Sequence, residues 1–357
     1  MPKFHTLTVR EVRRETPDCV SIAFDVPSDL HEDYVFTQGQ YLTLKTELGG
    51  EEVRRSYSIC SSPYSGELRV AVKRVEGGRF STFANTDLQA GDRLDVMTPL
   101  GNFYTELDPV HENHYVAFAA GSGITPLRSI IEATLEKEPK SHFTLFYGNR
   151  GVEHIIFREA IEALKSIYLD RFTVHHVLSR EHPGSELFFG HIDESKCDVF
   201  CKLLIDVDEV AAFFLCGPEA MIHAVRQTLL QQGVDAKRVH YELFTSPVGP
   251  LGQKSPSRPK PAKEVHASIE ITIDGNTFSF DLDSGGQTIL DAAIRSGADL
   301  PFACKGGVCS TCKAKLLEGE VDMDVNYALE PDEVEAGYVL TCQSHPRSGR
   351  VVVSYDL

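Results

Sequence analysis

The sequence lacks any long uninterrupted run of apolar residues, although its hydrophobic content is an ordinary 42%. A helix that crosses a bilayer needs about 20 such residues, so no membrane-spanning helix is expected. The first residues, MPKFHTLTVRE, also lack the apolar stretch of a secretory signal. We therefore expect a protein of the cytoplasm that has no membrane partner.

Basic residues are scarce: 35 Lys and Arg stand against 52 Asp and Glu, which gives a formal net charge of -17. Sequence-independent nucleic-acid binding depends on cations that neutralise phosphates, so a nucleic-acid partner is not expected. Residues 265–357 carry 15 acidic and 6 basic side chains. Such an acidic surface either steers a basic protein partner or only keeps the protein soluble.

A disulfide framework is not expected, because nine cysteines are an odd number in a chain without an export signal. The spacing of four cysteines indicates another use. Cys304, Cys309 and Cys312 follow the pattern C-x4-C-x2-C, and Cys342 follows after 29 further residues. This is the pattern of plant-type ferredoxins, in which four thiolates hold a 2Fe-2S cluster.

The main alternative for these four cysteines is a zinc site, which also uses thiolates alone. Zinc knuckles usually pair two CxxC units and this chain has one, so the spacing favours iron and sulfide. Gly306 and Gly307 add a physical reason, because residues without a Cβ let a loop wrap closely and aim N–H groups at sulfur atoms. Of the remaining cysteines, four are interpreted as structural, namely Cys19, Cys60, Cys197 and Cys201. Cys216 is the exception.

The first hundred or so residues contain short segments of alternating polarity, separated by turn clusters such as SSPYSGE and EGG. They predict a small antiparallel β-barrel whose strands include residues 6–12, 20–26, 42–46 and 68–72.

From residue 115 onwards the pattern changes to continuous apolar runs, namely YVAFAAG, FTLFYG, FTVHHVLS and AAFFLCG. These runs alternate with helix-length segments such as 127–135 and 154–164, which is typical of a parallel α/β sheet. Residues 246–264 hold five prolines and almost no large apolar side chains, so they predict a semi-extended linker. Beyond it, ASIEITIDGNTFSFDL predicts a hairpin that turns at Asp274 and Gly275, followed by one helix, TILDAAIRS.

A candidate flavin site lies at the end of one barrel strand, where Arg55, Tyr57 and Ser58 fall within the segment RSYS. A flavin needs an aromatic face, a hydrogen-bond donor near N5 and a cation for its phosphates, and these three side chains supply them. In the next loop, Gly78 and Ser81 offer a bare amide and a hydroxyl to a pyrophosphate at a helix start. Taken alone, RSYS is as typical of a solvated strand end, but its position before a nucleotide domain favours a flavin.

A candidate nucleotide site follows the apolar strand YVAFAA as the turn GSGITP. Gly121 and Gly123 let the backbone approach a pyrophosphate, Thr125 is expected to cap the following helix, and Pro126 suits its first turn. The turn differs from the G-x-G-x-x-G fingerprint, because a proline stands in place of the third glycine.

Two further turns are expected at the same edge of the parallel sheet, where ligands bind. Cys216 begins the turn CGP after the strand AAFFL, and Ser179 and Arg180 end another strand. A hydroxyl beside a guanidinium suits a 2′-phosphate, which favours NADPH over NADH, although Arg180 could also be only a surface arginine.

In this order, the three groups of motifs resemble the ferredoxin-NADP reductase superfamily with a ferredoxin fused at the C-terminus, over essentially the whole chain. The segments RRSYSIC, EGGRFS, AAGSGITP, YGNR, ADLPFACKGGVCSTCK and NYALEPDEVEAGYVLTCQ are most similar to the reductase subunits of phenylacetyl-CoA epoxidase complexes. The resemblance implies a flavin-binding β-barrel over 1–106, a nucleotide-binding α/β domain over 107–245 and a linker over 246–264. It also implies a β-grasp (ubiquitin-like) α+β ferredoxin domain over 265–357.

The resemblance also implies the cofactors FAD and 2Fe-2S, with NADPH as the electron donor and di-iron oxygenase subunits as the acceptor. Its motifs place the FAD contacts at Arg55, Tyr57, Ser58, Gly78 and Ser81, and the nucleotide contacts at Gly121, Gly123, Thr125, Ser179, Arg180 and Cys216. Cys216 would lie beside the nicotinamide, Ser58 and Tyr57 beside the flavin ring, and Glu242 and Phe244 would approach that ring from the second domain.

Two other functions stay open at this stage. The same reductase design serves other acceptors, such as a ring-hydroxylating dioxygenase, a steroid hydroxylase, a hybrid-cluster protein or a free ferredoxin. A redox-sensing protein could also keep these cofactors without turnover. The sequence contains no carboxylate/His di-iron pattern and no nucleophile with its base, so the chemistry on the organic substrate is expected in a different chain.

Overall fold

The computed structural model describes residues 3–244 and 265–356 of the chain. These residues fall into two compact units, one formed by Phe4–Phe244 and the other containing residues 265–356. The predicted linker over 246–264 lies outside the described residues. In the described part of the chain, no helix combines the length and the apolar character needed to cross a membrane.

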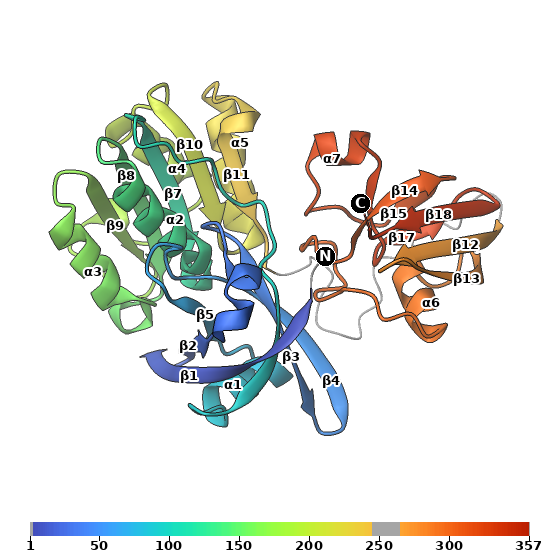
Figure 1. Ribbon diagram of the computed structural model, residues 1–357. Coiled ribbons are helices and arrows are strands. Elements are labelled where there is room, and N and C mark those ends of the chain that lie inside the picture. Colours follow the sequence, from blue (N-terminus) through green and yellow to red (C-terminus); the bar gives the residue numbers. More distant parts are fainter. Residues whose placement is uncertain (1–2, 245–264, 357) are drawn as a thin grey trace. The chain divides into compact units, whose positions relative to one another are not determined.

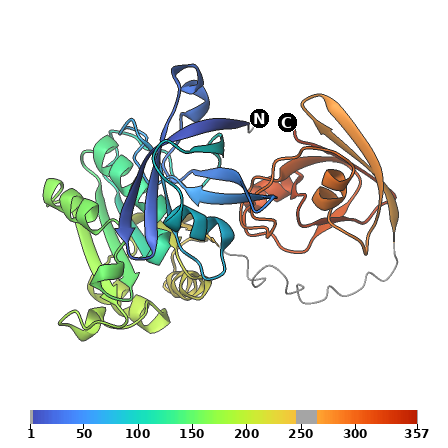
Figure 2. The same ribbon diagram turned by 90° about the horizontal axis from the view of Figure 1, so that it is seen from below.

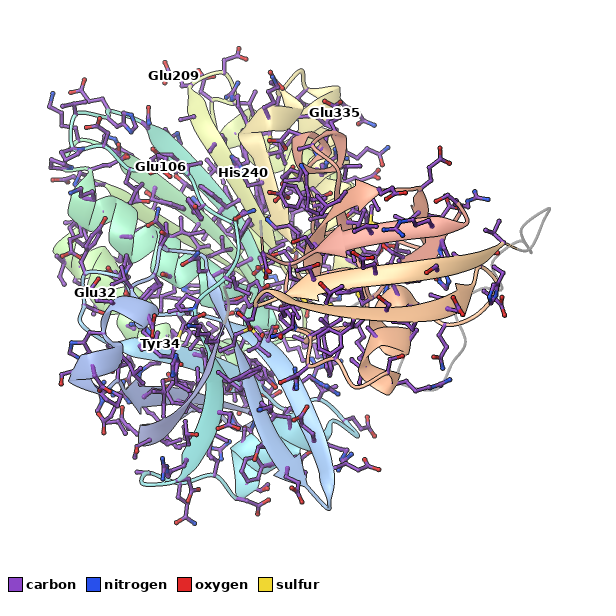
Figure 3. All side chains as sticks on the ribbon, turned by 45° about the vertical axis from the view of Figure 1, so that its right-hand side comes forward. Glu32, Tyr34, Glu106, Glu209, His240 and Glu335 are labelled. Carbon is purple, nitrogen blue, oxygen red and sulfur yellow. The ribbon has the colours of Figure 1, made fainter. Side chains whose placement is uncertain are left out.

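The first part of the larger unit is the expected antiparallel barrel, a six-stranded sheet in the order β4-β3-β6-β1-β2-β5 (Figure 1). A β-bridge between Ile59 and Val70 joins the end of β4 to β5 and so closes the sheet. Tyr34 is buried at the side of the barrel (Figure 3), where its hydroxyl donates to the carbonyl of Val96 at 2.6 Å. The elements are β1 (Phe4–Thr16), β2 (Cys19–Asp25), β3 (Tyr41–Leu48), β4 (Glu51–Ser58), β5 (Leu68–Lys73), α1 (Arg79–Thr86) and β6 (Arg93–Met97).

The second part of this unit is a five-stranded sheet in the order β11-β10-β7-β8-β9, in which every strand pair is parallel. The chain passes from β7 to β8 and β9 and then returns to the other side of β7. The gap between β7 and β10 is therefore the topological switch point, where ligands bind in open α/β sheets. The elements are β7 (His114–Ala120), α2 (Ile124–Lys137), β8 (His142–Asn149), α3 (Arg158–Ile167), β9 (Phe172–Leu178), α4 (Glu194–Leu203), β10 (Val210–Cys216), α5 (Glu219–Gln231) and β11 (Val239–Glu242).

One predicted helix boundary is wrong. The helix expected over 154–164 begins four residues later, at Arg158, because Phe157 before it has a φ of 61° and cannot belong to a right-handed helix. The helix expected over 127–135 lies within α2, and the four apolar runs form β7, β8, β9 and β10.

One hydrophobic cluster spans the barrel and the α/β sheet. Cys19, Cys60 and Ala71 from the barrel belong to the same buried cluster as Ile124 and Leu127 at the start of α2. The interior of the barrel holds a second cluster of its own, built from the inward-facing residues of its strands. The shared cluster means that the barrel and the α/β sheet are packed as one body.

The smaller unit has a mixed sheet in the order β13-β12-β18-β14-β16, with β12 and β18 parallel and the other pairs antiparallel. The predicted hairpin turn is confirmed, since Asp274 and Gly275 have φ values of 51° and 72°. Helix α6 lies against this sheet (Figure 2), and the Thr288 side chain caps it by accepting the N–H of Asp291 at 3.3 Å. The elements are β12 (His266–Ile273), β13 (Asn276–Asp283), α6 (Ile289–Arg295), β14 (Lys313–Glu318), β15 (Val321–Met323), α7 (Pro331–Glu335), β16 (Tyr338–Leu340), β17 (Ser344–Pro346) and β18 (Arg350–Ser354).

Candidate functional site

The candidate flavin residues Arg55, Tyr57 and Ser58 all lie on β4, the strand that closes the barrel against β5. The ring of Tyr57 packs 5.5 Å from that of Phe80, centroid to centroid, at an angle of 34°. Burial raises the pKa of the Tyr57 phenol above its usual range, so the ring stays neutral. Tyr57 therefore offers the flat, uncharged face that a flavin ring needs.

Gly78 is the residue before α1, and the start of this short helix has no room for a side chain there. A Cβ on Gly78 would lie 2.5 Å from Ser81 Oγ and 3.1 Å from the carbonyl oxygen of Val75. Ser81 Oγ accepts the N–H of Val75 at 3.1 Å and donates to the carbonyl of Gly78 at 3.3 Å, so this hydroxyl holds the turn together. The first N–H groups of a helix have no intrahelical acceptor, which leaves them suited to an anion.

The candidate nucleotide turn and the CGP turn pack against each other, backbone to backbone, at the switch point. A Cβ on Gly123 would lie 2.0 Å from the carbonyl oxygen of Cys216, and one on Gly217 would lie 3.0 Å from the N of Ala120. Gly121 has a φ of 55°, a conformation that favours glycine. These glycines are therefore required by close packing, and the two turns together form one surface at the carboxyl edge of β7 and β10.

The expected capping of α2 by Thr125 is wrong. The residue before α2 is Gly123, and Thr125 lies inside the first turn, where its hydroxyl donates to the carbonyl of Ser122 at 3.0 Å. A side chain in that turn points back at the preceding carbonyls and cannot reach the free N–H groups. Pro126 lies in the first turn of α2, as the sequence predicted.

Ser58 contacts the carboxyl group of Glu242, and Cys216 lies next to Glu242 on the neighbouring strand. The hydroxyl of Ser58 on β4 donates to Glu242 Oε2 at 3.0 Å, and Glu242 on β11 lies directly beside Cys216 in the parallel register. Burial raises the pKa of the Glu242 carboxyl to about 7, and the hydrogen bond from Ser58 lowers it in part. Burial, and secondly the charge of Glu242, raise the pKa of the Cys216 thiol. Cys216 is therefore a neutral thiol at physiological pH, and Glu242 can hold a proton there.

The shifted pKa of Glu242 makes a prediction about stability. Its ordinary value is 4.5, so between pH 4.5 and about 7 the folded protein keeps a proton that the unfolded chain releases. The resulting stability is present in full below pH 4.5 and is lost as the pH rises through 7. Relative to Glu242→Gln, the wild type should lose at most about 3 kcal/mol of unfolding free energy over that range. Urea unfolding of both proteins, monitored by the release of flavin, measures the difference between their unfolding free energies at each pH. A difference that stays constant with pH contradicts the raised pKa of Glu242.

Ser179 and Arg180 lie at the end of β9, two strands from β7 and on the side away from β10. The N–H groups of Ser179 and Arg180 donate to the carbonyls of Asn149 and Arg150 at 2.9 and 2.8 Å. Neighbouring strands lie about 4.8 Å apart, so the end of β9 is about 10 Å from the candidate nucleotide turn after β7, which we call the glycine turn. A dinucleotide that lies along the edge would therefore reach from Cys216 to Arg180, and Arg150 is a second cation at its far end.

Sequence reasoning missed Lys73, the last residue of β5. Its Nζ lies 3.6 Å from where a Cβ on Gly121 would be and 3.7 Å from Asp18 Oδ2. A half-buried ammonium beside a glycine turn provides a cation for a phosphate. The sequence gives no sign that a lysine at the end of a strand binds phosphate, because the glycine turn that Lys73 approaches is 48 residues away along the chain.

The four candidate cluster ligands lie in two pairs in the smaller unit. Cys309 Sγ donates to Cys304 Sγ at 3.0 Å, and the thiols of Cys312 and Cys342 are hydrogen-bonded to each other. The bond from Cys309 lowers the pKa of Cys304 to about 6, and the bond from Cys312 lowers that of Cys342. In the described residues, no three Cys, His, Asp or Glu side chains surround a position for one metal ion. A paired arrangement of thiols fits a cluster with two irons, each held by two sulfur ligands.

Backbone and side-chain donors surround these sulfur atoms. The N–H of Gly306 donates to Cys304 Sγ at 3.3 Å, and Gln343 Nε2 approaches Cys342 Sγ at 3.5 Å. Gly307 has a φ of 74°, and a Cβ there would lie 2.9 Å from the Val325 side chain. The expected need for a glycine in this loop is therefore confirmed at position 307. Donors of this kind stabilise thiolate ligands.

Comparison with known proteins identifies the family to which this chain belongs. The chain is 45% identical over 356 residues to a subunit of the 1,2-phenylacetyl-CoA epoxidase of Escherichia coli K12, with 100% of this chain and 99% of that protein covered. The chain belongs to the ferredoxin-NADP reductase superfamily with a C-terminal 2Fe-2S domain. Three domain families match in the order predicted: an oxidoreductase FAD-binding domain over 6–104, an oxidoreductase NAD-binding domain over 118–227 and a 2Fe-2S iron-sulfur cluster binding domain over 271–347.

Other members of the superfamily match over nearly the full length. The ferredoxin reductase component of 3-ketosteroid-9-alpha-monooxygenase from Rhodococcus rhodochrous is 32% identical over 98% of this chain and 96% of its own. The solved structure of phthalate dioxygenase reductase has a TM-score of 0.59 at 22% identity, with 98% of both chains covered, and so shares the fold. The predicted multidomain fold and the identification as an oxidoreductase are thereby confirmed. The predicted domain boundaries and the roles of the individual site residues stay predictions.

Proposed function

We propose that this protein takes a hydride from NADPH onto FAD and passes the electrons singly, through its 2Fe-2S cluster, to a di-iron oxygenase that epoxidises phenylacetyl-CoA. The observation that carries the proposal is the contact of Ser58 with Glu242, since it joins the candidate flavin strand to the strand next to Cys216, where the CGP turn begins. The 45% identity to a subunit of a phenylacetyl-CoA epoxidase supports this choice of acceptor.

Each group of residues has its own task. Tyr57 gives the flavin ring its flat neighbour, and the amides at the start of α1 hold its phosphates. The glycine turn after β7 holds the nucleotide pyrophosphate, with Lys73 as its cation. A bound flavin supplies the conversion between a two-electron donor and a one-electron acceptor. The four cysteines of the smaller unit would hold a 2Fe-2S cluster, which supplies one-electron chemistry.

Glu242 and Ser58 hold the proton that the reaction needs. With both cofactors bound, a hydride from NADPH would bring two electrons and one proton to the flavin, and a second proton would be needed for a neutral product. Because the pKa of Glu242 is about 7, its carboxyl can carry that proton near physiological pH and exchange it through the Ser58 hydroxyl 3.0 Å away. The neutral thiol of Cys216 is buried and lies on the strand next to Glu242.

The preference for NADPH rests on Arg180. Arg180→Ala should raise the KM for NADPH by about 10- to 100-fold, because a charge-assisted bond to a phosphate contributes about 1.5–3 kcal/mol. The KM for NADH should change little. Steady-state kinetics with both nucleotides measures the ratio, and Arg180→Lys, which keeps the charge, should recover part of it. Equal effects on the two nucleotides would remove the 2′-phosphate assignment.

The acceptor is tested by reconstitution. Purified reductase is mixed with oxygenase components of a phenylacetyl-CoA epoxidase, and NADPH consumption is followed with and without phenylacetyl-CoA. Consumption that depends on the acyl-CoA is the expected result. The matched control is the oxygenase component of a 3-ketosteroid-9-alpha-monooxygenase, because the reductase component of such an enzyme is 32% identical to this chain. Faster electron delivery to the steroid enzyme than to the epoxidase would replace the proposed acceptor.

A further inference from the structure

A set of buried polar contacts joins the barrel to α2 at a place that the proposed chemistry does not use. The hydroxyl of Ser129, on the second turn of α2, donates to the carbonyl of Ser61 at 2.7 Å. Both residues are buried, with exposed fractions of 0% and 2%. Ser61 follows the candidate flavin strand by three residues, and α2 begins at the candidate nucleotide turn.

The same loop is held a second time by the carboxyl group of Glu132, which is mostly but not fully buried. The backbone N–H of Ser62 donates to the Glu132 side chain, one turn further along α2. Glu132 also accepts from Arg128 Nε at 2.8 Å, and the Arg128 guanidinium lies over the ring of Phe157, 4.6 Å from its centroid. The side chains of Arg128 and Glu132 are only 16% and 14% exposed. An ion pair that is largely shielded from water, and whose partners are also hydrogen-bonded or stacked, holds its geometry well.

The loop itself is firmly attached to the barrel. Ser61 Oγ donates to the carbonyl of Glu67 at 2.6 Å and accepts the N–H of Arg69 at 3.2 Å, so it is tied to the start of β5. The N–H of Cys60 donates to the carbonyl of Arg69 at 2.8 Å. A displacement of α2 would therefore pull on a rigid part of the barrel and not on a free loop.

We propose that Ser129 and Glu132 are positioning residues, which hold the flavin-bearing barrel and the nucleotide turn at the separation that hydride transfer requires. The inference rests on the proposed function, because it assumes a flavin on β4 and a nicotinamide nucleotide at the glycine turn. Hydride transfer needs its donor and acceptor atoms about 3–3.5 Å apart, so the contact between the two halves controls the rate. We call this contact set (Ser61, Ser62, Arg128, Ser129 and Glu132) the junction clamp.

The test compares two serine-to-alanine variants. Ser129→Ala removes the bond to Ser61, whereas Ser141→Ala removes hydrogen bonds of an equally buried hydroxyl that lies away from the clamp. Ser141 is 0% exposed, and its hydroxyl donates to Glu138 Oε2 at 2.6 Å. Stopped-flow bleaching of the flavin by NADPH, without oxygen, gives the rate of hydride transfer for each protein. Thermal unfolding gives the loss of stability that the two variants share.

The junction clamp predicts that Ser129→Ala slows flavin bleaching about tenfold or more at saturating NADPH, with the dissociation constant for NADP⁺ nearly unchanged. The isotope effect with NADPH deuterated at C4 should become larger and more dependent on temperature. Amide hydrogen exchange of residues 59–65, measured without nucleotide, should accelerate in the same variant. Glu132→Gln, which keeps an acceptor for Ser62, should be milder than Glu132→Ala.

Two outcomes separate the clamp from the proposed function. If Ser129→Ala bleaches no more slowly than Ser141→Ala at a comparable loss of stability, or if exchange in 59–65 is unchanged, the positioning role is overturned. If the wild-type flavin is bleached by neither NADPH nor NADH, the proposed function itself fails, whatever the variants do. If NADPH bleaches the wild-type flavin normally and bleaching is slowed in Ser129→Ala but not in Ser141→Ala, the result supports both the clamp and the proposed function.

Discussion

Cys309→Ser should abolish the NADPH-dependent reduction of cytochrome c and leave the bleaching of the flavin by NADPH intact. Cys309 belongs to one of the two thiol pairs and is only 7% exposed, so water has little access to replace the lost ligand. A serine hydroxyl keeps its proton at neutral pH and is a poor ligand for iron compared with a thiolate. The flavin and nucleotide motifs lie in the other compact unit, which the substitution does not touch.

The control for this prediction is Cys201→Ser on α4, which replaces a buried cysteine outside the cluster motif. Iron and acid-labile sulfide should be lost in Cys309→Ser and kept in Cys201→Ser. Ferricyanide, which can accept electrons from a flavin directly, should still be reduced by both variants. If bleaching by NADPH also disappears in Cys309→Ser, then the two steps are not separate and the order of the electron carriers is wrong.

Gly123→Val should slow the bleaching of the flavin by about 100-fold or more and leave the FAD content unchanged. Its Cβ would lie 2.0 Å from the carbonyl oxygen of Cys216 and 2.3 Å from the carbonyl carbon. Backbone atoms cannot move aside as a flexible side chain can, so the two turns at the switch point must separate. A displacement of about 1 Å between reacting groups costs on the order of 100-fold in rate.

Gly148→Ala on the neighbouring strand β8 is the matched control, since its Cβ would meet only ordinary contacts at 3.4 Å and beyond. The absorbance of bound FAD reports the barrel, and the titration of the flavin spectrum with NADP⁺ reports the nucleotide site. Normal NADP⁺ binding by Gly123→Val would show that the glycine turn is not where the nucleotide binds.

Local sequence patterns predicted the parts of the site that depend on neighbours along the chain. The cysteine spacing indicated the cluster loop, and GSGITP indicated a strand-to-helix turn because its glycines and proline have direct conformational effects. The hairpin turn at Asp274 and Gly275 was predicted for the same reason. The capping by Thr125 was wrong because several residues near a helix start compete for that role, and the sequence does not show where the helix begins.

Contacts between distant segments could not be predicted. Ser58 and Glu242 are 184 residues apart, and their contact depends on how the barrel packs against the α/β sheet. The approach of Lys73 to Gly121 depends on the same packing, and so does the junction clamp. Resemblance to a family indicated Glu242, but its pKa of about 7 follows from the burial that the fold imposes.

The boundary between the two compact units coincides with a boundary in the chemistry. All the residues assigned to the two-electron step lie within Phe4–Phe244, and the one-electron carrier lies in the unit that contains residues 265–356. Recombination of genes at this boundary can replace the unit that delivers single electrons to the acceptor and keep the unit that takes electrons from the nucleotide. The same hydride-accepting half can therefore be inherited intact by enzymes that oxidise unrelated compounds.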